Sequence, residues 1–209
     1  MRVNTNAWNR VRYGLFSPFY DVVGRLLDRG RRMSIKLVDP KPGERILIVG
    51  AGTGLDLPYL PRNADTTAVD LTPSMLRKAE TRARKLDLPV TFHVMDAHRL
   101  GFPNASFDVV LLHLILAVVP DPHACIREAA RVLKPDGRIA IFDKFLPDGT
   151  RPSLIRRMLG YVTDALFSDI NRQLRPLLAE AGLVAVRDEP AFIGRLFRIV
   201  VASPATFDQ

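Results

Sequence analysis

Three glycines separated by single residues, Gly50, Gly52 and Gly54, follow the short uncharged apolar run at 46–49. Glycines at this density let the backbone turn tightly and let a ligand lie against it without meeting a Cβ atom. Asp70 follows Gly50 by 20 positions. That spacing places a carboxylate at the end of the next strand, where the ribose hydroxyls of a nucleoside would lie. The glycines and Asp70 therefore predict a site for a nucleoside-containing ligand.

The glycine spacing distinguishes between nucleotide-type ligands. A dinucleotide site has the pattern GxGxxG, whereas this chain reads GxGxG and places Leu55 where the third glycine of the dinucleotide pattern would stand. No Gly-Lys-Ser/Thr follows the turn, which excludes a P-loop, and no basic residue lies in the turn to meet a pyrophosphate. The pattern therefore indicates a nucleoside ligand other than a dinucleotide or a nucleoside triphosphate.

Alternating strands and helices must position these residues. The apolar patterns and the Gly/Pro punctuation predict helices at about 18–37, after the glycine turn to 60, 73–86, 122–133, 152–167 and 170–181. They predict strands at 45–49, 66–70, 90–95, 107–112, 138–142, 183–187 and 196–202, the last antiparallel. This order implies an α/β fold whose mostly parallel seven-stranded sheet carries helices on both faces. Ligands bind such sheets beyond the carboxyl ends of the strands, where Gly50, Asp70, Asp96, His113 and Asp143 all fall.

Composition sets the broad class. A length of 209 residues with 47% hydrophobic residues predicts one globular domain. The single cysteine, Cys125, excludes an internal disulfide framework and a multi-cysteine zinc site. The first residues lack the apolar core of a signal peptide, and no apolar run reaches the roughly 18 residues of a spanning helix. We therefore expect a cytoplasmic chain, with at most peripheral contact at the inner face of a membrane.

The net charge of +8 is unevenly distributed. Residues 1–36 carry a net charge of +6 and residues 151–176 carry +3, which leaves the rest of the chain near neutral. Aromatic side chains are mixed with arginines near the start of the chain, at Trp8, Arg10, Arg12, Tyr13, Phe16, Phe19 and Tyr20. This combination suits a helix lying at an anionic membrane surface, although a helix that covers a pocket and exposes solvated arginines has the same pattern.

Four segments together resemble a class I S-adenosylmethionine (SAM)-dependent methyltransferase of the type 11 group: ILIVGAGTG, Asp70, VMDAHRLGFPNASFDVV and AARVLKPDGRIAIFD. GTGLDLPYLP, SPFYD and DRGRR are similar to bacterial phospholipid (phosphatidylethanolamine) N-methyltransferases, and the central region is also similar to ubiquinone/menaquinone C-methyltransferases. The resemblance implies a Rossmann-like single domain over 1–209. It would comprise amphipathic N-terminal lid helices (1–42), a SAM-binding core (43–146), and substrate-side helices with the final strands (147–209).

The resemblance also implies roles for individual residues. The cofactor S-adenosyl-L-methionine, or its product S-adenosyl-L-homocysteine, would contact Gly50, Ala51, Gly52, Gly54, Asp70, Leu71, Met75, Asp96, Ala97, Leu112 and Tyr20. Asp70 would accept hydrogen bonds from the ribose hydroxyls and Asp96 would face the adenine edge. Leu112 and His113 would face the reacting methyl, and Tyr20 would close over the cofactor, with His113 and Tyr20 as the catalytic residues. Arg31, Arg32 and Tyr161 would bind the acceptor. No metal is expected.

Two acceptor classes remain open. A headgroup amine of a phospholipid needs no strong base once its proton is lost, whereas a carbon or phenol nucleophile of a quinone or other small molecule would need one. His113 is the candidate base or hydrogen-bond partner of the acceptor, and its position at a strand end favours a role in the pocket without requiring a base. The alternative is a strand-end histidine bonded to a backbone carbonyl. We expect a phospholipid amine as acceptor, contact with an anionic membrane, no nucleic-acid partner, and a monomer or homodimer.

Overall fold

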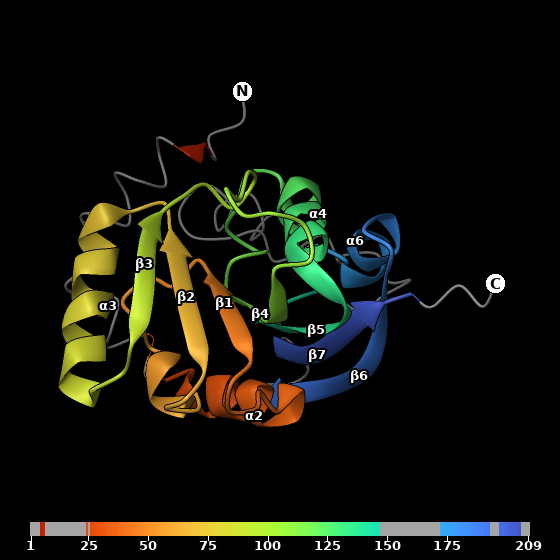
Figure 1. Cartoon of the computed structure of the whole chain (residues 1–209). Coiled ribbons are helices and arrows are strands. Elements are labelled where there is room, and N and C mark those ends of the chain that lie inside the picture. The colour runs from red at the N-terminus through yellow and green to blue at the C-terminus, as the bar shows by residue number, and fades with distance from the viewer. Residues whose placement is uncertain (1–4, 7–23, 25, 147–171, 193–196, 206–209) are drawn as a thin grey trace.

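The computed structural model describes residues 5–6, 24, 26–146, 172–192 and 197–205, and all structural statements below concern these residues. Their strands form one seven-stranded sheet in the order β3-β2-β1-β4-β5-β7-β6 (Figure 1). Five strands are parallel to one another: β1 (Arg45–Val49), β2 (Asp65–Asp70), β3 (Val90–Val94), β4 (Phe107–His113) and β5 (Leu133–Lys144). β7 (Phe197–Pro204) is antiparallel to β5, and β6 (Leu183–Phe192) is antiparallel to β7. The predicted mixed, mostly parallel sheet is confirmed.

Helices cover both faces of the sheet. On one face, α4 (Pro122–Val132) and α6 (Leu174–Glu180) share a core with Leu47, Val110 and Ile141. On the other face, α2 (Asp28–Val38) and α3 (Pro73–Leu86) share a core with the neighbouring positions Ile46, Val109 and Ala140. Successive side chains of a strand point to opposite faces, so each buried strand supplies both cores at once. This arrangement explains the nearly unbroken apolar runs in the sequence.

Local chemistry sets the helix boundaries. The side chain of Asp121 caps α4 by accepting a hydrogen bond from the Ala124 N–H at 3.0 Å. α3 begins with Pro73 at its first position, but Thr72 makes no side-chain cap. Instead, the Thr72 N–H donates to Asp70 Oδ1 at 2.8 Å. Asp70 therefore satisfies one of the free N–H groups at the start of α3.

Several predicted boundaries were wrong. The helix expected after the glycine turn is only a 3-10 turn, Leu57–Tyr59, and Leu60 is extended because it precedes Pro61. β5 begins at Leu133, five residues before the prediction, and β6 continues to Phe192 rather than stopping at Arg187. β6 continues past Pro190 because it is an edge strand with register shifts, which tolerate a residue without an N–H. The predicted helix at 152–167 lies outside the described residues.

Close packing of α2 on the sheet determines which of its side chains reach the ends of the strands. A Cβ atom at Gly30 would overlap the ring of Phe142 in β5, so only glycine allows this approach. Arg31 and Ser34, one and four residues later, are buried beneath the helix. Among the described residues, no helix is long and apolar enough to span a membrane.

Candidate functional site

A cavity lies at the carboxyl ends of β1, β2 and β4, where the sequence placed the ligand. Its walls come from the glycine turn, the residues after β2, β3 and β4, the first turn of α3, and one residue near the amino terminus. The lining residues are Asn6, Gly50, Gly52, Val69, Asp70, Leu71, Thr72, Met75, Met95, Asp96, Ala97, His113, Leu114, Ile115, Val118 and Val119. The carboxylates of Asp70 and Asp96 therefore lie among mainly apolar walls, an arrangement typical of small-molecule sites.

The glycine turn has a backbone conformation that residues with a side chain rarely adopt. Gly50, Gly52 and Gly54 have φ angles of +72°, +54° and +78°. The N–H groups of Gly50 and Ala51 both donate to the Val69 carbonyl of β2 at 2.9 Å, which fixes the turn against the sheet. Gly50 and Gly52 line the cavity, whereas Gly54 faces α3, where a Cβ would lie 3.1 Å from Ala79. The first two glycines therefore leave room for a ligand, and the third leaves room for a helix.

The predicted cofactor residues divide into two groups. Gly50, Gly52, Asp70, Leu71, Met75, Asp96 and Ala97 meet at the cavity. Ala51, Gly54 and Leu112 are not among its lining residues. Ala51 and Leu112 are buried in the two cores on opposite faces of the sheet. Because β4 continues to His113, the side chain that lines the cavity at the end of this strand is one position after Leu112.

The carboxylate of Asp70 is held by backbone N–H groups on both oxygens. Oδ2 accepts from Gly52 and Oδ1 from Thr72, each at 2.8 Å. Burial raises the pKa of Asp70, and these backbone hydrogen bonds act in the opposite direction. The Thr72 side chain and the Leu71 backbone also bond to the carboxylate. Asp70 therefore presents an oriented acceptor at the wall of the cavity.

Asp96 is similarly oriented, by partners that include a residue distant in sequence. Its Oδ1 accepts from the His98 backbone N–H at 2.9 Å and contacts the His98 ring Nδ1 at 2.6 Å. Its Oδ2 accepts from the Asn6 side-chain amide at 2.6 Å. Asn6 could not be predicted from the sequence, because nothing in its local pattern relates it to a strand end 90 positions away. Asp96 keeps acceptor capacity on Oδ2 for a donor in the cavity.

His113 lines the cavity but is not arranged as the predicted base. The residue is 4% exposed, its Nδ1 lies 2.8 Å from Asp56 Oδ1, and its Nε2 lies 2.9 Å from the Ser34 hydroxyl. Because a carboxylate only accepts, Nδ1 carries the proton donated to Asp56. When the imidazole is neutral, Nε2 then accepts from Ser34. Both ring nitrogens therefore bond to side chains of the protein, rather than to the backbone carbonyl of the alternative interpretation.

Arg31 is also part of this buried network rather than of an acceptor site. Its Nη1 lies 3.0 Å from Asp56 Oδ1, and the side chains of both residues are almost fully buried. Burial alone would raise the pKa of Asp56, but His113 and Arg31 lower it below its ordinary value. Asp56 therefore remains ionised and pairs with Arg31. Arg31, which was predicted to bind the acceptor, is thus buried against a carboxylate and does not line the cavity.

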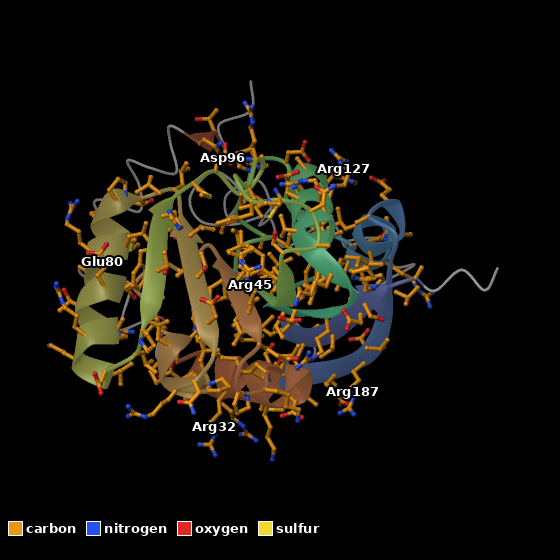
Figure 2. The ribbon with its side chains drawn as sticks, in the orientation of Figure 1. Arg32, Arg45, Glu80, Asp96, Arg127 and Arg187 are labelled. Atoms are coloured by element: carbon orange, nitrogen blue, oxygen red, sulfur yellow. The ribbon has the colours of Figure 1, made fainter. Side chains whose placement is uncertain are left out.

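The remaining acceptor predictions do not gather at the cavity. Arg32 is exposed, and Figure 2 shows it at the edge of the molecule opposite Asp96. Tyr20 and Tyr161 lie outside the described residues. Cys125 is fully buried, and burial raises the pKa of its thiol to about 12, so it supplies no thiolate. In the described part of the chain, three or more His, Cys, Asp or Glu side chains nowhere gather to hold a metal ion.

Comparisons with known proteins identify the family. Residues 47–141 match the model of a methyltransferase domain. The chain is 30% identical over 176 residues to the phosphatidylethanolamine N-methyltransferase of Cereibacter sphaeroides, covering 83% of this chain and 86% of that protein. The chain belongs to the SAM-dependent methyltransferases. This methyltransferase is also 34% identical over 131 residues to the demethylmenaquinone methyltransferase of Renibacterium salmoninarum, but it spans only about half of that relative (54%).

Solved structures agree with the fold of the methyltransferase. The [4+2]-cyclase SpnF superposes with a TM-score of 0.78 at 21% identity, covering 97% of each chain. Geranyl diphosphate C-methyltransferase from Streptomyces coelicolor A3(2), in complex with Mg²⁺, geranyl diphosphate and S-adenosyl-L-homocysteine, superposes at 0.72 with 15% identity, over 87% of this chain and 80% of that one. One fold thus carries different chemistries, so the acceptor must be argued from the site. The predicted family, fold and cofactor are confirmed.

Proposed function

We propose that this methyltransferase transfers the methyl group of SAM to the headgroup amine of a phospholipid of the phosphatidylethanolamine type, at the anionic inner face of a membrane. The arrangement of His113 supports an amine acceptor. The relative from Cereibacter sphaeroides and the basic residues at 1–36 and 151–176 support a phospholipid. The two parts of the proposal can fail separately, so they are argued and tested separately.

The cavity residues divide the binding of SAM among them. Asp70, oriented by its hydrogen bonds to the Gly52 and Thr72 backbone, accepts hydrogen bonds from the ribose hydroxyls. Leu71 and Met75 flank the adenine, and Asp96 with the backbone of Ala97 meets its polar edge. Gly50 and Gly52 leave space for the methionine portion. When bound, SAM supplies an activated methyl group on a sulfonium, and the protein aligns it and excludes water.

The nature of the acceptor follows from the side chains near the end of β4. A neutral amine attacks with its own lone pair and loses its proton afterwards, so the step requires no base in the wall of the cavity. A carbon or phenol acceptor needs a group that removes a proton. Among the described lining residues His113 is the only histidine, and its nitrogens are bonded to Asp56 and Ser34. In the proposed binding of SAM, Asp70 and Asp96 meet the ribose and the adenine. This observation carries the proposal of N-methylation.

Radiolabelled SAM tests the lipid part. Purified enzyme is mixed with anionic vesicles that contain phosphatidylethanolamine, and separately with vesicles of equal charge in which phosphatidylcholine replaces it. We expect label in monomethyl phosphatidylethanolamine from the first vesicles alone, and co-sedimentation of the enzyme with both. Failure to methylate the lipid, together with turnover of a soluble amine, would reject the phospholipid and keep the amine.

The alternative is methylation of carbon or oxygen in a quinone or another small molecule, for which the demethylmenaquinone methyltransferase relative is the argument. The pH profile tests whether the acceptor is an amine. An alkyl ammonium of the lysine type has a pKa of about 10.4. Methylation of an amine should therefore accelerate about tenfold per pH unit between pH 7 and 9, because only the neutral form attacks. A flat profile in this range would contradict an amine whose proton is lost to solvent.

A further inference from the structure

The loop that follows β4, Leu114–Val119, forms one wall of the cavity. Leu114, Ile115, Val118 and Val119 all line it. Ile115 packs tightly on the glycine turn, since a Cβ atom at Gly50 would lie 2.6 Å from Ile115 Cδ1. Any movement of this loop therefore changes the space between it and the turn. The position of the loop is a determinant of how SAM fits.

The loop begins with a strained residue. Leu114 has a φ of +58°, in the left-handed region that residues other than Asn, Asp and Gly rarely adopt. Its N–H donates to the Phe142 carbonyl of β5 at 2.8 Å, which links the strained residue to the sheet. A conformation of this kind persists only where surrounding contacts hold it. The loop must therefore be held by contacts from outside its own sequence.

Two buried or partly buried charged groups behind the loop supply such contacts. Asp143 is fully buried at the end of β5, and its Oδ2 accepts a hydrogen bond from the Ala117 N–H at 2.9 Å. The guanidinium of Arg172 donates to the carbonyl of Leu116 and, at 2.8 Å, to that of Val119. The backbone of Arg172 is itself anchored, because its carbonyl accepts from the Leu146 N–H at 2.8 Å. The carboxylate and the guanidinium thus bond to three peptide groups of the loop.

We propose that Arg172, together with Asp143, is a positioning residue for the cofactor: it sets the affinity for SAM by holding the wall at 114–119 against the glycine turn. Neither residue lines the cavity, so the effect passes through the loop. Hydrogen bonds from a charged donor are among the stronger ones in proteins, and they replace hydrogen bonds that the loop carbonyls would otherwise make to water. The proposal depends on the binding of SAM and not on the identity of the acceptor.

Isothermal titration with S-adenosyl-L-homocysteine tests the proposal, with Arg131→Met as the matched control. Arg131 also donates to two loop carbonyls, Leu100 and Phe102, at 2.8 Å each, but neither residue lines the cavity. We expect Arg172→Met to weaken binding about tenfold or more, and Arg172→Lys to restore part of it. Arg131→Met should leave the affinity within about twofold of the wild type, whatever its effect on thermal stability.

Steady-state kinetics separate positioning from a general loss of structure. With any acceptor that is turned over, Arg172→Met should raise the KM for SAM while kcat at saturating SAM stays within about threefold of the wild type. If Arg172→Met does not fold, Asp143→Asn replaces the carboxylate that accepts from the Ala117 N–H by a neutral, weaker acceptor and should weaken S-adenosyl-L-homocysteine binding in the same direction. An unchanged affinity for S-adenosyl-L-homocysteine in the variant that folds would overturn the proposal. A loss of affinity in Arg131→Met as large as that in the variant would overturn it as well.

Discussion

Replacing Asp56 by alanine should destabilise the protein severely, although Asp56 lines no part of the cavity. Asp56 is 2% exposed, and its carboxylate lies 3.0 Å from the Arg31 guanidinium and 2.8 Å from His113 Nδ1. Its removal leaves a buried guanidinium without this carboxylate and a buried imidazole N–H without its acceptor. Breaking a buried ion pair from one side costs about 3–5 kcal/mol. Since a domain is stable by only about 5–15 kcal/mol, the variant should lose a large share of its free energy of unfolding.

The sign of the pH dependence follows from the pKa of Asp56. Burial raises this pKa, but His113 and Arg31 outweigh burial, and the net shift is downward from 3.8. A carboxyl group whose pKa is lower in the folded than in the unfolded state stabilises the fold when both states are ionised. This contribution is fully present above about pH 4 and is lost as the pH falls below 3.8 toward the lower folded value. At pH 7 and pH 5, the Asp56 contribution should therefore be undiminished.

Urea unfolding followed by far-ultraviolet circular dichroism measures the effect, with Asp65→Ala as the control. Asp65 is paired with Arg45 at 3.6 Å, but its side chain is 65% exposed, so its removal should cost less than about 1 kcal/mol. The double variant Arg31→Met/Asp56→Leu removes both charges and should recover much of the loss. A free energy of unfolding for Asp56→Ala within 1 kcal/mol of the wild type would refute the buried network as a structural element.

Two further predictions concern the cavity itself. Asp70→Asn keeps the shape but not the charge, and should weaken binding of SAM by about 10- to 100-fold in calorimetry. Because burial raises the pKa of Asp70 above 3.8, the affinity of the wild type for SAM should fall as acidification protonates the carboxyl. The affinity of Asp70→Asn should not show this pH dependence. Equal affinities of the wild type and the variant at pH 7 would remove Asp70 from the ribose site. His113→Asn retains an N–H for Asp56 and should lower kcat less than tenfold, whereas loss of a general base costs about 10²–10⁴-fold. A fall of more than a hundredfold in kcat with intact SAM binding would make His113 a base.

The sequence predicted the parts of the site that depend on strand ends. A strand end can be read from its apolar run and from the turn that follows it, and parallel strands bring their ends to one edge. Gly50, Asp70 and Asp96 were found in this way, and they meet at the cavity. The boundaries of β5 and β6 were missed because pairing with neighbours, rather than the local pattern, decides where a strand stops.

Contacts between segments that are distant in the chain could not be predicted from the sequence. The local sequence alone places Arg31 on the exposed face of an amphipathic helix. Only the close packing of Gly30 on Phe142 shows that Arg31 is buried against Asp56. His113 was correctly placed at a strand end, but its partners Asp56 and Ser34 are 57 and 79 positions away. Such partners decide whether a histidine is a base or a structural group, and no local pattern specifies them.

A competition between acceptors tests the central claim most directly. The enzyme, labelled SAM and anionic vesicles containing both phosphatidylethanolamine and demethylmenaquinol are incubated together, and the labelled lipids are separated and identified by mass spectrometry. The proposed N-methylation, with no base supplied by His113, predicts label in the phosphatidylethanolamine headgroup. Label in the quinol alone would contradict it and would assign the enzyme to carbon methylation.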